Sequence, residues 1–455
     1  MSEKKLFFVS LGCPKNRVDS EVMLGMAQGT GYQVSQAPED ADILVVNTCS
    51  FIENARQESI DTILEMAEIK EQYPGKKLVV TGCLPQRYPE ELSKELTEVD
   101  HFIGTGQIPA FQEVLSTDEA DRDLASEAPG WLYSHMSPRV LSTPSYMAYV
   151  KIAEGCDRNC TFCAIPSFRG KQKSRPIESI VEEVRSLCSQ GVVEINLIAQ
   201  ELNGYGRDLP HLPDGRKPDL ADLLLALEDV DPGPHWIRLH YLYPYKFTNR
   251  MIKVMANSKR VVPYVDMPLQ HISNNVLKKM KRAGTDAHIR HLLDQLRTEI
   301  PGITIRTTFL VGFPGETEED FQELYNFLEE QRFDRVGIFG FSKEEGTPSH
   351  DYPDQVPEDV IEERKRMLYE LQAEISEEKL QRFMDQTVEV LVEGVSEETE
   401  LLLEGRFAGQ APEIDGTVYI NDGTASPGDI VQVRIEQTGE HDIVGGIVED
   451  KIHIH

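Results

Sequence analysis

Short apolar runs and amphipathic stretches alternate through most of the chain. In the N-terminal quarter, three runs rich in β-branched residues have the length and composition of strands buried in a parallel sheet. These strands are expected at 5–10, 42–47 and 77–82. The segments between them, 18–31 and 51–75, repeat apolar residues at helical spacing and end in glycine. Strand–helix–strand units of this kind predict an α/β fold, with a doubly wound parallel sheet over residues 1–115.

The pattern fades over residues 116–143, where Pro, Ser and Asp are frequent, and this stretch is interpreted as a linker. Strand and helix patterns then alternate again. Six strands are expected, at 146–155, 192–200, 235–242, 261–269, 303–313 and 335–341. Six such units predict a partial (β/α)6 barrel, with its chemistry at the carboxyl ends of the strands. With a charged connecting helix at 357–384, the barrel is expected to fill residues 144–384.

The hydrophobic period changes to two residues after this helix. Strands are expected at 387–395, 417–422, 429–438 and 442–449. Short alternating strands without helices between them predict a small all-β barrel over residues 385–455.

Length and composition agree with this organisation. A chain of 455 residues is long enough for about three domains. No run of about 18 apolar residues is present, which argues against a transmembrane helix. The N-terminus does not match a signal-peptide cleavage region, so a cytoplasmic protein with no membrane partner is expected.

The charge balance is strongly acidic, with 46 Lys and Arg against 77 Asp and Glu and a net charge of −31. Residues 386–455 alone contain 15 acidic and 3 basic residues. Nucleic-acid affinity depends largely on cationic side chains that neutralise phosphates, so this balance disfavours polyanions such as DNA. It favours a basic macromolecular partner, or it serves solubility alone.

The strongest chemical signal is GCDRNCTFC, in which Cys156, Cys160 and Cys163 are spaced C-x3-C-x2-C directly after the first expected barrel strand. Three thiolates in so short a loop can hold three corners of a [4Fe–4S] cluster and leave the fourth iron open to a small molecule. Structural zinc is the alternative, but it usually takes four Cys or His ligands, and no fourth is near in sequence.

Three further cysteines, Cys13, Cys49 and Cys83, each follow an N-terminal strand. Because the carboxyl ends of parallel strands lie at one edge of a sheet, these cysteines are expected to meet in space. One strand-end cysteine is commonly a small core residue, but three in register predict a second three-cysteine site, for a second iron–sulfur cluster. Cys188 lies on the apolar side of a helix and is expected to be a core residue.

With the aromatic Phe162 before its last cysteine, the 156–163 loop resembles the motif of the radical S-adenosylmethionine (SAM) superfamily. In that superfamily the open iron binds SAM, and one electron from the cluster cleaves it to methionine and a 5′-deoxyadenosyl radical. That radical abstracts hydrogen from an unactivated carbon. The resemblance implies that SAM is a cofactor, that Phe162 lies near the adenine, and that an electron donor is a partner.

The whole chain resembles the methylthiotransferase family, which combines two three-cysteine sites, a barrel and a terminal β-module. The last module resembles a TRAM domain. In that family one SAM supplies the methyl group carried on sulfur, and another supplies the radical that activates the substrate carbon. The resemblance therefore implies two [4Fe–4S] clusters, of which the N-terminal one presents the sulfur.

The family has two main branches. One modifies an adenosine in transfer RNA (MiaB-like), and the other modifies the β-carbon of an aspartate in small-subunit ribosomal protein twelve (RimO-like). The stretches SLGCPKNRVDSE (10–21) and KIAEGCDRNCTFCAIPSFRG (151–170) resemble the second branch. The acidic module also suits a basic protein better than RNA. A monomeric enzyme acting on this ribosomal protein is therefore expected.

Two other interpretations stay open: the transfer-RNA enzyme, which has the same cysteine ligands, and a non-catalytic iron–sulfur module associated with the ribosome. The second is disfavoured because a purely structural cluster normally takes four protein ligands. The loop AQELNGYG (199–206) departs from the QDTT-like turn usual in the RimO-like branch, with Leu202 and Asn203 in place of threonines. No general acid or base is identified.

Overall fold

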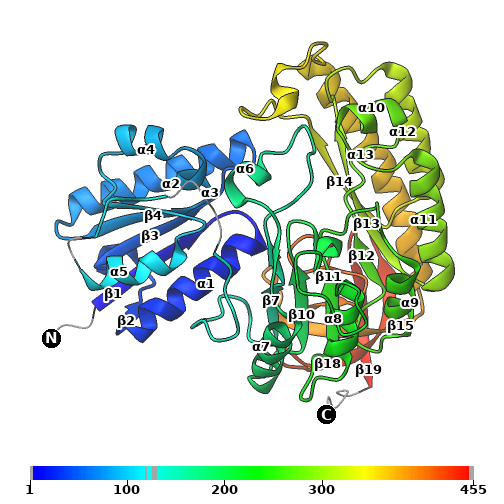
Figure 1. Cartoon of the computed structure of the whole chain (residues 1–455). Helices are drawn as coiled ribbons and strands as arrows, with labels where there is room; N and C mark the ends of the chain where they lie inside the picture. The colour runs from blue at the N-terminus through cyan, green and yellow to red at the C-terminus, as the bar shows by residue number, and fades with distance from the viewer. Residues whose placement is uncertain (1–3, 118–119, 126–130, 450–455) are drawn as a thin grey trace.

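The computed structural model describes residues 4–117, 120–125 and 131–449. Along the described chain come a parallel sheet, an open barrel of strands and helices, and a small closed β-barrel (Figure 1). The expected fold class is confirmed.

The first sheet has six parallel strands in the order β2-β1-β3-β4-β5-β6. The strands are β1 (Lys4–Ser10), β2 (Tyr32–Val34), β3 (Ile43–Thr48), β4 (Lys77–Gly82), β5 (His101–Gly104) and β6 (Asp123–Leu124). The helices are α1 (Pro14–Gly29), α2 (Glu53–Gln72), α3 (Cys83–Arg87), α4 (Pro89–Glu95) and α5 (Phe111–Ser116). Apolar side chains of α1 and α5 cover one face of the sheet, and those of α2, α3 and α4 cover the other. The sheet is doubly wound, and it includes part of the 116–143 segment, since β6 pairs with β5.

The strand order changes direction at β1 and β3, because β1 lies between β2 and β3. In open α/β sheets, ligands bind outside the carboxyl ends of the strands at such a switch point. The ends are level, since Ser10 of β1 is paired with Asn47 of β3, and Thr48 is paired with Gly82 of β4. The loops that follow β1, β3 and β4 therefore start from one edge.

The second unit is an open barrel of six parallel strands, as the pattern predicts. Its strands are β7 (Met147–Lys151), β10 (Glu194–Ile198), β11 (Trp236–Leu239), β12 (Tyr264–Asp266), β13 (Thr304–Val311) and β14 (Arg335–Gly340). They form two sheets, β11-β10-β7 and β12-β13-β14, joined by a parallel bridge between Ile237 and Val261. A minor antiparallel pair, β8 (Ala153–Glu154) and β9 (Lys173–Ser174), lies beyond β7.

Helices cover the outside of this barrel (Figure 1). The short α6 (Ile165–Arg169) instead lies between the barrel and the N-terminal unit, against α3. The covering helices are α7 (Ile177–Ser189), α8 (Leu220–Glu228), α9 (Asn249–Asn257), α10 (Asn274–Lys279), α11 (Asp286–Glu299), α12 (Glu318–Gln331) and α13 (Glu358–Leu380). The last of these is the expected connecting helix. Cys188 on α7 packs against the apolar layer between strands and helices, as predicted.

The C-terminal unit is a closed five-stranded barrel in the order β15-β16-β17-β19-β18. Its strands are β15 (Thr387–Val395), β16 (Leu403–Phe407), β17 (Val418–Asp422), β18 (Ile430–Thr438) and β19 (Ile443–Glu449). The pattern missed β16, whose sequence LEGRF carries Glu404, Gly405 and Arg406. Gly405 is required there, because a Cβ at this position would lie 2.5 Å from the carbonyl oxygen of Leu391.

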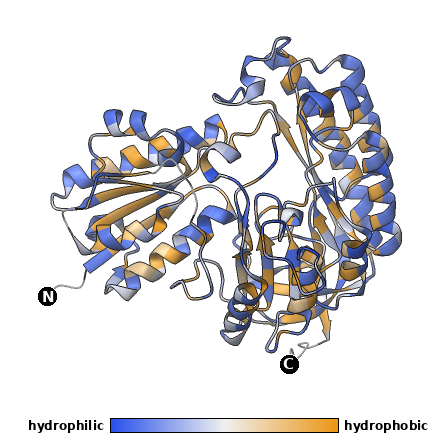
Figure 2. Ribbon diagram, in the orientation of Figure 1, coloured by the Kyte–Doolittle hydropathy of each residue, from blue (hydrophilic) through white to orange (hydrophobic). Residues whose placement is uncertain are grey.

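The three units share one buried apolar cluster, which includes Val22 of α1, Tyr149 of β7 and Leu391 of β15. Figure 2 shows the apolar strands enclosed by helices with hydrophilic outer faces. No helix within the described residues is long and apolar enough to span a membrane. The common cluster fixes the N-terminal sheet against the barrel, which is what positions the two sets of cysteines.

Candidate functional site

Cys13, Cys49 and Cys83 lie together at the carboxyl edge of the N-terminal sheet, as the sequence predicts. Cys13 follows β1 and is the N-cap of α1, Cys49 directly follows β3, and Cys83 begins α3. Gly12 has a φ of +84°, and a Cβ there would lie 2.8 Å from the Cβ of Cys49. Only glycine allows both this backbone conformation and this close approach.

The surroundings of these three thiols differ in electrostatics. Burial would raise the pKa of Cys13, but Lys15, Arg169 and the backbone N–H groups at the start of α1 lower it overall. Burial raises the pKa of Cys49, and it raises the pKa of Cys83 to about 12 against the opposing effect of Arg169. Cys13 also raises the pKa of both Cys49 and Cys83, and Cys49 raises the pKa of Cys83. Cys13 is thus the member of this set that most readily forms a thiolate.

Cys156, Cys160 and Cys163 lie in a loop at the carboxyl side of the barrel, beyond β7. The paired strands β8 and β9 close its base, and the N–H of Cys156 donates to the carbonyl of Gly170 at 3.0 Å. Within the loop, the N–H of Arg158 donates to the Sγ of Cys156 at 3.4 Å, and the N–H of Cys163 donates to the carbonyl of Cys160 at 3.2 Å. These hydrogen bonds order the loop, and its three thiols lie close together, since Cys160 raises the pKa of both Cys156 and Cys163.

A cation anchors this loop to the barrel. The Nε of Arg158 donates to Glu201 at 2.7 Å, and its guanidinium lies 4.0 Å from the ring centroid of Tyr243. Burial raises the pKa of Cys156 to about 11 and that of Cys163 to about 12, which disfavours the thiolate form of both.

Phe162 points to an apolar part of the barrel rather than to solvent. It is half-buried against a cluster formed by Val276, Met280, Leu310 and Phe313. The structure therefore places an aromatic ring between the cysteine loop and the ends of α10 and β13.

The two sets of cysteines face one another across the contact between the N-terminal sheet and the barrel. Cys83 packs against Phe168 and against Ala164, which directly follows Cys163. From the same segment, the Nη2 of Arg169 donates to the Sγ of Cys83 at 3.2 Å. The sequence placed both sets but gave no indication of this contact.

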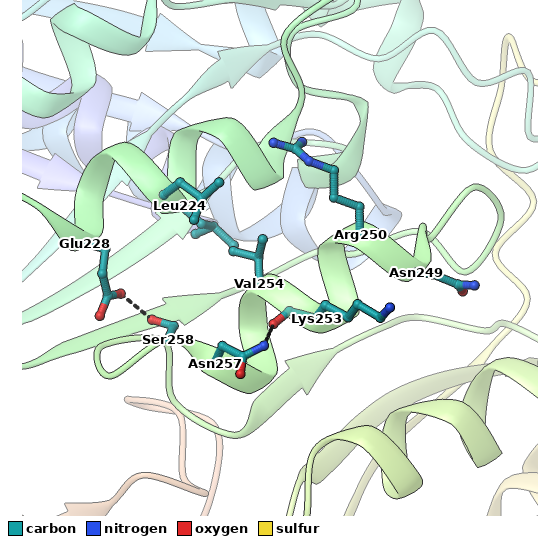
Figure 3. A pocket seen from close by; sticks show the side chains of 9 residues that line it. Leu224, Glu228, Asn249, Arg250, Lys253, Val254, Asn257 and Ser258 are labelled. Carbon is teal, nitrogen blue, oxygen red and sulfur yellow. Dashed lines mark hydrogen bonds between the residues drawn. The ribbon is translucent and has the colours of Figure 1, made fainter.

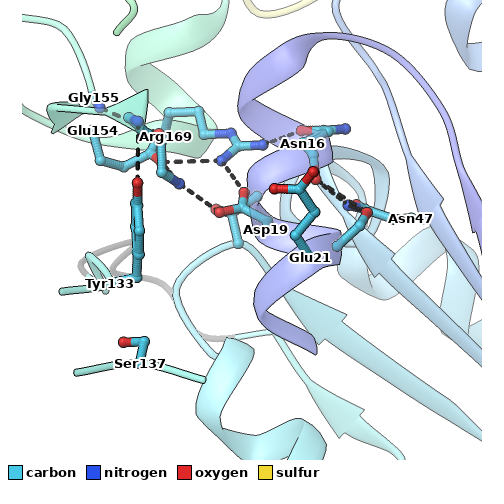
Figure 4. A network of polar contacts seen from close by, with 12 residues as sticks. Asn16, Asp19, Glu21, Asn47, Tyr133, Ser137, Glu154, Gly155 and Arg169 are labelled. Carbon is cyan, nitrogen blue, oxygen red and sulfur yellow. Dashed lines mark hydrogen bonds and ion pairs between the residues drawn. The ribbon is translucent and has the colours of Figure 1, made fainter. Parts of the chain in front are cut away.

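A buried ionic network surrounds Arg169 (Figure 4). Its Nη1 lies 2.9 Å from Asp19 of α1 and 3.3 Å from Glu154, and its Nη2 also donates to Asn16. Lys151 bridges the same two carboxylates, at 2.5 Å from Asp19 and 2.7 Å from Glu154. The network joins α1 to both ends of the barrel's cysteine loop.

An Asp19→Ala variant is expected to lower the free energy of unfolding by about 3–5 kcal/mol, because Lys151 and Arg169 would share one remaining carboxylate in a buried site. Urea denaturation followed by circular dichroism measures this change. Asp61→Ala is the control, since Asp61 is exposed on α2 and accepts one hydrogen bond, from Gln57. A loss below about 1 kcal/mol for Asp19→Ala would show that the network does not hold the two units together.

Residues of the 199–206 loop serve the barrel's own structure. Gln200 donates to Glu154 at 2.5 Å, the Asn203 side chain bonds the backbone of Tyr243, and Tyr205 donates to the carbonyl of Arg175 at 2.7 Å. The loop thus orients Glu154 beside the cysteine motif, although it departs from the usual sequence.

A pocket lies elsewhere, between α8 and α9 on the outer layer of the barrel (Figure 3). It has a volume of about 520 Å³, and its lining includes the apolar Leu224 and Val254 and the basic Arg250 and Lys253. None of the six cysteines of the two sets lines it.

No group of three or more His, Cys, Asp or Glu side chains in the described ranges is arranged to hold a single metal ion. In a cubane cluster each thiolate binds a different iron, so the ligands stand farther apart than those that share one ion. The two three-thiol sets are therefore compatible with cubane clusters and not with single metal ions.

Comparison with known proteins identifies the family. A protein of Anaeromyxobacter sp. (strain Fw109-5), named ribosomal protein uS12 methylthiotransferase RimO, is 50% identical over 448 residues, covering 98% of this chain and 94% of its own. The chain belongs to the RimO family of methylthiotransferases. RimO proteins of Myxococcus xanthus and Geobacter sulfurreducens are 50% and 49% identical, and each match covers 98% of this chain and at least 92% of the relative.

The family profiles follow the three units. Uncharacterized protein family UPF0004 matches residues 5–104, the radical SAM superfamily matches 150–328, and the TRAM domain matches 386–448. A solved structure of the radical SAM methyltransferase TsrM from Kitasatospora setae has a TM-score of 0.56 at 16% identity, covering 77% of each chain. It shares the fold. As a RimO-family protein, the chain is a transferase of the radical SAM class that uses SAM and [4Fe–4S] chemistry.

Proposed function

We propose that this protein transfers a methylthio group to the β-carbon of an aspartate in ribosomal protein uS12. The observation that carries the proposal is the pair of three-cysteine sites that face each other across one interface. Two sites are needed because activation of a carbon and delivery of sulfur are separate tasks. The printed names of the full-length relatives support the same substrate.

We assign the six cysteines to two [4Fe–4S] clusters. Cys156, Cys160 and Cys163 are the ligands of the cluster that binds SAM, and the N-terminal set is the ligand set of the other. The donor set fits, because each site offers three thiols and no fourth cysteine. The charges fit as well: the N-terminus of α1 and Arg169 direct positive charge at thiolates that carry negative charge when they bind iron.

When bound, the first cluster and SAM supply a radical at the 5′ carbon of the adenosyl group, and the second cluster supplies the sulfur. The protein's own residues position these groups. Arg158 fixes the cysteine loop on Glu201, Arg169 holds the two sites at a constant separation, and Phe162 offers an aromatic face for the adenine.

The expected partners are a basic protein substrate and an electron donor. The C-terminal barrel suits the substrate, because its exposed Glu397, Glu398 and Glu400 lie together on the turn between β15 and β16. Burial and the neighbouring carboxylates, including Glu397 and Glu398, raise the pKa of Glu404. Among the residues that the structure describes, none forms an ion pair with Glu397, Glu398 or Glu400, so negative charge accumulates on this turn. We also propose that the enzyme acts as a monomer in the cytoplasm, where ribosomal proteins are assembled.

Replacing Glu397, Glu398 and Glu400 with lysine is expected to raise the KM for uS12 by about tenfold at low salt, because steering of a basic partner is lost. The difference should shrink as salt rises. The control makes the same change of charge at Glu319, Glu329 and Glu377, which are exposed on α12 and α13. Equal effects of the two triple variants would show that net charge alone matters and that the turn is not a docking surface.

The function is tested by anaerobic reconstitution with iron and sulfide, followed by SAM, a reductant and two competing substrates. One substrate is a peptide of the uS12 loop, and the other is transfer RNA that carries the modified adenosine. Mass spectrometry is expected to find one methylthio group on the peptide aspartate. Modification of the RNA alone would keep the chemistry and overturn the substrate.

A further inference from the structure

Lys15 is a buried cation without a carboxylate partner. It is the second residue of α1, two positions after Cys13, and its exposed fraction is 8%. Its Nζ lies 3.3 Å from the ring centroid of Tyr241. Within residues 4–117, 120–125 and 131–449, no Asp or Glu forms an ion pair with it.

The other deeply buried lysine shows what is missing. Lys151 is 1% exposed and has two carboxylates, Asp19 and Glu154, within 2.7 Å. Burying an ammonium without a counter-charge is costly, and proteins normally provide one. At Lys15 the Tyr241 side chain and the Cys13 thiol favour the charged form of the ammonium, and neither is a carboxylate, so the site can take an anion from outside the chain.

Lys15 lies where the N-terminal unit meets the mouth of the barrel. Tyr241 follows β11 at the carboxyl side of the barrel, and its φ of +61° is unusual for an aromatic residue. Its N–H donates to Asp266 at 3.1 Å, which fixes this conformation. The ammonium of Lys15 therefore extends from the N-terminal unit to the mouth of the barrel, beside Cys13.

We propose that Lys15 binds the side-chain carboxylate of the substrate aspartate, with Tyr241 holding the ammonium in place. This inference rests on the proposed function, in which the reacting β-carbon is directly bonded to that carboxylate. A charge-assisted contact at the carboxylate restrains the position of the carbon bonded to it. It also selects aspartate over its neutral isostere, asparagine.

The test is a cycle of two enzymes and two peptides. Wild type and Lys15→Met, both loaded with clusters and SAM, are titrated by calorimetry with the uS12 loop peptide and with the same peptide carrying Asp→Asn. Wild type is expected to bind the aspartate peptide about 10- to 100-fold more tightly than the asparagine peptide. Lys15→Met should bind both with similar, weak affinity. Lys15→Arg keeps the charge and should retain part of the preference.

Lys278→Met is the matched control, because Lys278 is exposed on α10, and it should retain the full preference. If Lys15→Met lowered the affinity for both peptides equally and kept the preference for aspartate over asparagine, the carboxylate contact would be overturned. A changed electron paramagnetic resonance signal with the preference intact would likewise overturn it and show that Lys15 serves the cluster. Failure of the proposed function is measured separately: mass spectrometry would then find no methylthio group on the aspartate peptide after incubation with wild-type enzyme.

Discussion

A Cys160→Ala variant is expected to lose SAM cleavage to background, a decrease of at least about 10³-fold. With one of its three thiolates removed, the loop at the barrel mouth can no longer hold a cluster with an open iron for SAM. The measurement is anaerobic formation of 5′-deoxyadenosine after reconstitution. Iron content should fall from about eight to about four atoms per chain.

Cys188→Ala is the control for this loss. It makes the same chemical change in the same unit, but its side chain packs against the apolar layer of the barrel and contacts neither cysteine set. It should keep both iron content and cleavage. Cleavage retained by Cys160→Ala would show that the barrel loop is not the SAM-binding cluster site.

A Cys13→Ala variant is expected to retain SAM cleavage while losing methylthio transfer to the peptide. The reason is the separation of tasks: Cys13 belongs to the set at the edge of the N-terminal sheet, which is assigned to sulfur delivery. Alanine at an N-cap without a side-chain hydrogen bond leaves α1 intact. Both 5′-deoxyadenosine and the modified peptide are quantified in one assay.

Cys49→Ala and Cys83→Ala should reproduce the behaviour of Cys13→Ala, because all three thiols are assigned to one cluster. Full methylthiolation by Cys13→Ala would rule out a second cluster at this edge. Loss of both activities by Cys13→Ala alone would instead indicate that α1 is needed for the barrel site, through Asp19 and Arg169.

Elements with a strong local pattern were predicted correctly. All six barrel strands and the first sheet's β1, β3 and β4 were found, because apolar runs of four to eight residues between turn residues specify buried strands. The missed strands are short or polar. β6 has two residues, and β16 contains glycine and charged residues, so its pairing with β15 and β17 is set by the barrel as a whole.

The sequence by itself determined the two cysteine sets. The 156–163 loop is local, and the ends of parallel strands necessarily share an edge, so Cys13, Cys49 and Cys83 had to converge. Only the tertiary structure decided how the sets face each other. Arg169 reaches Cys83 across 86 residues of sequence, and Lys15 reaches Tyr241 across an even longer separation. Such pairs leave no periodic signal, because a buried ionic contact depends on how two separately folded surfaces pack and not on the spacing of residues along either one.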